Sequence, residues 1–111
     1  MDIELVDLGE ATAVVKLDGK LNMISAPAFR DAVTGAVEAG KVRIAVDLTG
    51  VDFIDSSGLG ALISGLKTTR QAGGDLRIAS PNDQVRLVLQ LTNMERLLTA
   101  YDDATTAFAD A

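Results

Sequence analysis

The residues with the clearest chemical potential form the run Asp55-Ser56-Ser57-Gly58. A polar side chain at the start of a helix can accept a hydrogen bond from a free first-turn N–H group. A phosphate carried by one of these serines would instead place a dianion at the positive end of the helix dipole. Taken alone, the tetrapeptide is interpreted as a helix cap, because short motifs match by accident.

Several kinds of chemistry are excluded by composition. The chain has 111 residues, with no cysteine and no histidine. Disulfides, thiol nucleophiles, cysteine zinc sites and imidazole bases or ligands are therefore excluded. Ten basic residues against sixteen acidic ones give a net charge of −6, which leaves no basic footprint for nucleic acid. We expect no enzymatic activity, no catalytic residue, no cofactor, no metal and no nucleic-acid partner.

Membrane insertion and secretion are not indicated either. The opening residues Met1-Asp2-Ile3-Glu4 contain neither a cationic segment nor an apolar one. The longest uncharged run, residues 56–66, contains three glycines and is too short to span a bilayer. We expect a cytoplasmic protein without a membrane partner.

The first half of the chain predicts a hairpin, a helix and a buried strand. Apolar and polar residues alternate over residues 2–8 and 11–18, which predicts two antiparallel strands joined by the Gly9-Glu10 turn. Residues 19–24 are predicted as a loop. Ser25 is the predicted cap of a helix that carries Pro27 in its first turn. The apolar segment Val42 to Leu48 is typical of a central strand buried on both faces.

The second half alternates helices with short strands. The predicted elements are a helix from Ser57 to Ala72, a strand from Asp75 to Ser80, a helix opened by Pro81, a short strand from Leu97 to Tyr101, and a terminal helix from Asp103 to Ala109 capped by Asp102 or Asp103.

Together these elements predict a single α/β domain over residues 1–111. We expect a mixed, mainly parallel sheet with an N-terminal hairpin, packed by about four helices. Function in such sheets sits at the carboxyl ends of the parallel strands, which points to the loop after Leu48. The predicted core consists of Val15, Leu17, Phe29, Val33, Ile44, Val46, Leu59, Leu62, Ile63, Leu66, Ile78 and Val88.

In this context the serine loop gains significance. The segment Phe53-Ile54-Asp55-Ser56-Ser57-Gly58-Leu59-Gly60, together with the chain length and the order of elements, resembles the STAS family, the fold of bacterial anti-sigma factor antagonists. A supporting signature is the loop Gly19-Lys20-Leu21-Asn22. The resemblance runs from about Ala11 to Tyr101 and reverses the interpretation of the serine run as a cap alone.

The resemblance implies a phosphorylation switch. Ser56 would be the phosphoacceptor, and the unphosphorylated protein would bind an anti-sigma factor that is often itself a serine-protein kinase. Phosphorylation would release that partner, and a metal-dependent serine phosphatase would reset the switch. The implied partner face consists of Asn22, Asp55, Ser56, Ser57, Gly58 and Leu59.

The charge of this face predicts the charge of its partner. Asp47, Asp52 and Asp55 are expected to make the region acidic, which favours a cationic patch on the partner. The chain has Asn22 where the family usually has an aspartate, a change that keeps the shape and removes one negative charge. Asn22 is open to two interpretations, a contact with the kinase or only the closing of a turn.

Two alternatives are disfavoured by the sequence and a third stays open. A receiver domain needs an acidic pair after its first strand, and here that strand runs into a turn and a second strand. A phosphate-binding loop needs lysine after the second glycine of residues 60–68, where Leu66 stands. Within the same fold, the domain could be a non-phosphorylated docking subunit of a transport or other regulatory complex.

Overall fold

The computed structural model describes residues 1–109, so the last two residues of the predicted domain lie outside it. A five-stranded sheet has the order β1-β2-β3-β4-β5, with β1 antiparallel to β2 and the other neighbours parallel. The mixed, mainly parallel sheet and its opening hairpin are therefore confirmed. The bounds are β1 Asp2–Gly9, β2 Thr12–Leu21, α1 Ala26–Glu38, β3 Arg43–Ile54, α2 Ser56–Gln71, β4 Asp75–Ala79, α3 Asp83–Leu91, η1 Met94–Arg96, β5 Ala100–Tyr101 and η2 Ala104–Thr106.

Within the described residues there are three α-helices and two single 3-10 turns, where about four helices were predicted. The predicted terminal helix is reduced to the turn η2, in which the Asp103 carboxylate accepts hydrogen bonds from the backbone N–H and hydroxyl of Thr105. These two bonds lower the pKa of Asp103. Pro81 does not open α3, because the cap is Asn82, whose side chain accepts a hydrogen bond from the Val85 N–H.

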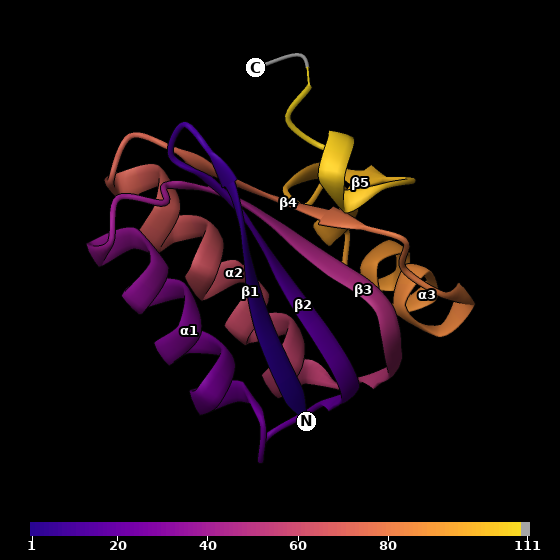
Figure 1. The fold of residues 1–111 in the computed structure, drawn as a ribbon. Coiled ribbons are helices and arrows are strands. Elements are labelled where there is room, and N and C mark those ends of the chain that lie inside the picture. Colours follow the sequence, from indigo (N-terminus) through magenta and orange to yellow (C-terminus); the bar gives the residue numbers. More distant parts are fainter. Residues whose placement is uncertain (110–111) are drawn as a thin grey trace.

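The two faces of the sheet carry cores of different size (Figure 1). On one face, Val15, Val46 and Ile78 join the main cluster that α1, α2 and α3 cover. On the other, Val14 and Ala45 pack in a smaller cluster beneath the C-terminal segment. Of the predicted core, Ile63 and Val88 are only partly buried, and the other ten residues are buried.

The central strand β3 is buried on both faces, as predicted, but it is longer than the sequence indicated. It continues to Ile54 and pairs with β2 along this extension. The strand β2 is also longer than predicted, because it includes residues 19–21 of the predicted loop. Gly50 permits this pairing, since a Cβ there would lie 2.9 Å from the carbonyl oxygen of Leu17. The two strands therefore end together, and their shared end determines where the serine run lies.

No helix within residues 1–109 is both long and apolar enough to cross a membrane.

Candidate functional site

The helix that follows β3 is capped by an aspartate, not by a serine. Asp55 has extended backbone angles, and its Oδ1 accepts a hydrogen bond of 2.9 Å from the Gly58 N–H. Its carbonyl accepts the next N–H, that of Leu59, at 2.9 Å. The run Asp55-Ser56-Ser57-Gly58 therefore does contain the helix cap, which is Asp55, and this residue orients the serine loop.

Because Asp55 holds the cap, the two serines keep their hydrogen-bonding capacity. Ser56 is exposed and Ser57 is half-buried. Within residues 1–109, neither hydroxyl and neither backbone N–H of the two serines has a hydrogen-bond partner. An exposed hydroxyl thus sits in the first turn of α2, beside two N–H groups that are free to donate.

The glycine of the run is required by packing. Gly58 is buried, and a Cβ at this position would collide with the carbonyl oxygen of Leu21 and lie 2.9 Å from Cγ1 of Ile54. The Asp55 N–H also donates to the Leu21 carbonyl, at 3.4 Å. The first turn of α2 is therefore pressed against the end of β2, which brings the loop beginning at Asn22 next to the serine loop.

Asn22 closes the turn between β2 and α1. Its Oδ1 accepts hydrogen bonds from the backbone N–H of Ile24 at 3.0 Å and of Ser25 at 3.2 Å. An aspartate oxygen could accept the same two bonds, so the departure from the family pattern keeps the turn and removes a charge. The turn-closing interpretation of Asn22 is confirmed, and its contact with a partner stays a prediction.

Ser25 occupies the start of α1, but its side chain does not cap that helix. Its hydroxyl donates to the carbonyl of Lys20 at 2.7 Å and accepts from the Asn22 N–H at 3.0 Å. The residue therefore fastens the turn to the end of β2. Its predicted position as the N-cap of α1 is confirmed, although its side chain makes no capping hydrogen bond. Met23 and Ile24, which the turn carries at its tip, are strongly exposed.

A shallow groove of about 390 Å³ begins at Ser56 and follows α2. Leu59, predicted as a partner contact, is 8% exposed and lines the groove from its buried side. Gly60 faces open space, since a Cβ there would have no neighbour within 4 Å. The remaining lining residues are Ile63, Ser64, Lys67, Thr92 and Met94. Ile63 was predicted to be a core residue, but it is only partly buried and lines the groove. The signal was its spacing of four residues from Leu59, which puts both side chains on the same side of the helix.

Asp47 does not belong to this site. It lies eight residues before Asp55 along an extended strand, a separation on the order of 20 Å, and its carboxylate accepts hydrogen bonds from the N–H and hydroxyl of Thr49. The acidic groups near Ser56 are therefore Asp52, which is exposed, and Asp55. No cluster of three acidic side chains within residues 1–109 could hold a metal ion.

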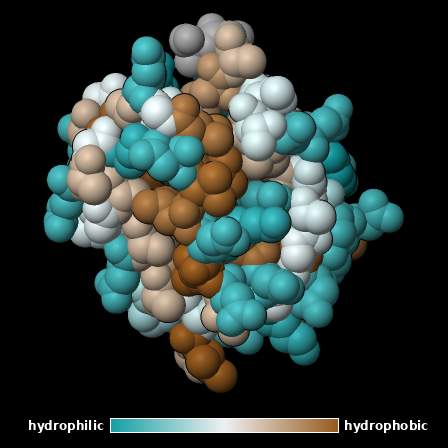
Figure 2. All heavy atoms as spheres, viewed as in Figure 1, coloured by the Kyte–Doolittle hydropathy of each residue, from teal (hydrophilic) through white to brown (hydrophobic). Residues whose placement is uncertain are grey.

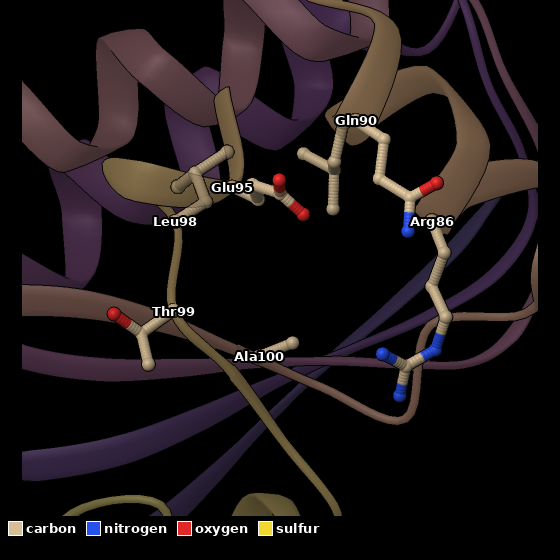
Figure 3. A pocket seen from close by; sticks show the side chains of 7 residues that line it. Arg86, Gln90, Glu95, Leu98, Thr99 and Ala100 are labelled. Carbon is tan, nitrogen blue, oxygen red and sulfur yellow. The ribbon is translucent and has the colours of Figure 1, made fainter. Parts of the chain in front are cut away.

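A second pocket, of about 290 Å³, lies between α3, η1 and β5 (Figure 3). Arg86 and Gln90 reach it from α3, and Glu95 faces them from the other side. It shares no lining residue with the serine groove. This second pocket is therefore separate from the candidate site, which comprises the turn after β2, the start of α2 and the groove along α2.

Comparison with known proteins identifies the family. The STAS domain family model matches residues 3–107. A Thermotoga maritima protein, described as a candidate anti-sigma factor antagonist, is 34% identical over 92 residues, which cover 82% of this chain and 81% of that protein. A crystal structure of a similarly described protein from the same organism has a TM-score of 0.84 and 30% identity, over 98% of this chain and 92% of that one.

The anti-sigma factor antagonist SpoIIAA shares the fold at 19% identity. Its unphosphorylated form has a TM-score of 0.83 over 99% of this chain and 98% of its own. Its phosphorylated form, from Bacillus, has a TM-score of 0.75 over 99% of this chain and all of its own. The resemblance drawn from the serine loop is thus confirmed over nearly the whole sequence, and the chain belongs to the STAS domain family.

Proposed function

We propose that this protein is an anti-sigma factor antagonist whose binding to an anti-sigma factor is switched off by phosphorylation of Ser56. Relatives that carry the name anti-sigma factor antagonist support the first part. The observation that carries the second part is the exposed Ser56 hydroxyl beside a helix cap that Asp55 already occupies.

The two serines differ in accessibility. Ser56 is exposed and stands at the first position of α2, whereas Ser57 is half-buried. A kinase must bring its own base, ATP and Mg²⁺, because the chain contains no histidine that could activate the hydroxyl. An exposed hydroxyl meets that requirement better, which favours Ser56 as the acceptor.

Phosphorylation would act on the partner more than on the fold. A phosphate adds about −1.5 to −2 charges and three acceptor oxygens. The free N–H groups of Ser56 and Ser57 can donate to it, and the helix dipole favours the added charge. A partner docked on the hydroxyl would have to desolvate a dianion beside Asp52 and Asp55, and a penalty of about 3 kcal/mol would weaken binding about a hundredfold.

The proposal includes two enzymes acting on this chain. The kinase is the anti-sigma factor itself or a protein associated with it, and its docking surface meets Asn22, Asp55, Ser56, Ser57 and the groove along α2 that Leu59 lines. Gly58 supports this face from beneath, through its packing against Leu21. A metal-dependent serine phosphatase removes the phosphate and restores binding.

The test is phosphorylation with the cognate kinase followed by mass spectrometry and by titration against the anti-sigma factor. We expect one phosphate, on Ser56, and partner affinity lowered about a hundredfold. Ser56→Ala should bind and resist phosphorylation, while Ser56→Asp should weaken binding only partly, because a carboxylate carries less charge.

Ser57→Ala is the matched control and should still accept phosphate. A phosphate on Ser57, or equal affinity before and after modification, would contradict the switch. Failure to capture an anti-sigma factor, with transporter subunits recovered instead, would assign the domain to a docking role.

A further inference from the structure

We propose that the tip formed by Met23 and Ile24 is an apolar anchor that inserts into an apolar pocket on the anti-sigma factor. This inference rests on the proposed function and deepens it by naming a contact outside the serine loop. The tip would supply affinity, while Ser56 would control whether that affinity is used.

The exposure of the tip is the first support. Ile24 is 86% exposed, the highest value for a large apolar side chain within residues 1–109, and Met23 beside it is 72% exposed. Single exposed apolar residues are ordinary, whereas grouped ones mark contact surfaces. The hydrophobic projection at the lower edge of Figure 2 lies where Figure 1 shows the turn between β2 and α1.

Further exposed apolar residues surround this end of the sheet. Phe53 is paired with Lys20 near the end of β2, and Met1 lies against Gly19 of the same strand. Both Phe53 and Met1 expose about two fifths of their surface, 40% and 41%. The tip is therefore one of several exposed apolar positions at this end of the sheet.

The backbone of the tip is also restrained by hydrogen bonds. The Asn22 side chain accepts the N–H groups of Ile24 and Ser25, and the Ser25 hydroxyl binds the carbonyl of Lys20. A preorganised turn loses little conformational entropy on binding, so more of the burial energy appears as affinity. This is the form that an anchor residue takes at an interface.

Position and charge identify the occupant. The turn begins one residue after Leu21, whose carbonyl contacts both the Asp55 N–H and Gly58. A protein that covers Ser56 therefore reaches the tip within the same interface. Asp52 precedes Phe53 on β3 and the Asp55 N–H contacts the Leu21 carbonyl, so acidic residues belong to the same end of the sheet as the turn. The fitting partner surface is therefore an apolar pocket with a cationic rim.

The experiment is calorimetric titration of purified anti-sigma factor with wild type, Ile24→Ser and Leu5→Ser. Ile24→Ser should weaken binding about thirtyfold, or about 2 kcal/mol. Leu5→Ser should bind like wild type, because Leu5 is equally replaceable at 50% exposure but pairs with Val15, six residues of strand from Leu21.

The outcomes separate the two proposals. No binding by wild type would overturn both the proposed function and the anchor. Binding by wild type with unchanged affinity for Ile24→Ser would overturn the anchor and leave the function standing, as would equal losses for Ile24→Ser and Leu5→Ser. Sedimentation of each variant covers the remaining occupant, because a homodimer that Ile24→Ser dissolves would assign the tip to a second copy of this chain.

Discussion

At the scale of single residues, one hydrogen bond determines which residue of the run Asp55-Ser56-Ser57-Gly58 caps α2 and which side chains stay free. Asp55 accepts the Gly58 N–H, so the serines are released from the cap and Ser56 remains available for modification. Sequence alone could not assign these roles, because aspartate and serine are equally good caps. Asp55 becomes the cap because β3 ends at Ile54, which makes Asp55 the first residue after the strand.

Removing this cap should cost stability without touching the core. Asp55→Ala should lower the free energy of unfolding by about 1 kcal/mol, because one first-turn N–H loses its acceptor. Urea denaturation of the variant measures the loss. Asp52→Ala, which removes an exposed carboxylate, is the control and should stay within about 0.5 kcal/mol of wild type. A loss for Ser57→Ala as large as that for Asp55→Ala would show that the serine holds the cap.

At the scale of elements, α2 owes its position to one glycine and its stability to the face it buries. Gly58 lets the first turn approach the end of β2, while Gly60, two residues on, faces open space. Leu62 is fully buried beneath the helix, as the spacing of apolar residues predicted.

The two glycines should therefore respond oppositely to the same substitution. Gly58→Ala should destabilise the fold by at least about 1–3 kcal/mol, because the new methyl group meets backbone atoms that have no room to move. Gly60→Ala should stabilise it by about 0.5–1 kcal/mol, since alanine is the better helix former. Thermal unfolding of the pair compares them directly. Equal effects would mean that α2 does not pack against Leu21 as described.

The buried face gives a larger expected loss. Leu62→Ala should lower the free energy of unfolding by about 2–5 kcal/mol through the cavity it leaves. Leu87→Ala is a suitable control, because Leu87 lies on α3 and is exposed. A loss below about 0.5 kcal/mol for Leu62→Ala would be typical of a surface position and would contradict this packing.

The spacing of apolar residues predicted the type of each element better than the residues at which it begins and ends. The apolar pattern of α1, α2 and β3 fixed their types and most of the core. It failed at residues 49–54 and 19–21, where glycines and polar residues resemble a loop. These segments form strand only because they pair with each other across irregular register, a tertiary effect that local pattern does not contain. The same extension carried the serine loop away from Asp47.

At the scale of the whole molecule, the proposed docking face and the C-terminal closure occupy different regions. The serine loop lies at the carboxyl end of β3, whereas η2 and Phe108 cover the sheet face that the helices leave open. Arg77 holds this cover through its guanidinium, which lies 5.2 Å from the ring centre of Tyr101 and 4.6 Å from that of Phe108. Its Nη1 donates to the Ala107 carbonyl at 2.7 Å.

Loss of this arginine should loosen the cover and leave partner binding intact. Arg77→Ala should reduce the free energy of unfolding by about 2 kcal/mol, because it removes two cation–π contacts and a charged hydrogen bond. Arg70→Ala is the matched control, because Arg70 and Arg77 both form an ion pair with Asp75 and Arg70 is the more exposed of the two. Loss of Arg70 should cost at most about 0.5 kcal/mol. Equal unfolding midpoints for the two variants would contradict the closure, and weakened partner binding by folded Arg77→Ala would contradict the separation of regions.

The Arg77 closure also makes the molecule a natural optical reporter. Tyr101 is the only tyrosine in a chain without tryptophan, and it sits under that guanidinium. Intrinsic tyrosine emission therefore follows the seating of the C-terminal segment alone, and the serine loop and the Met23–Ile24 tip are spectroscopically silent. Any tryptophan emission in a mixture belongs to the partner, so docking can be followed at that wavelength without a contribution from this chain.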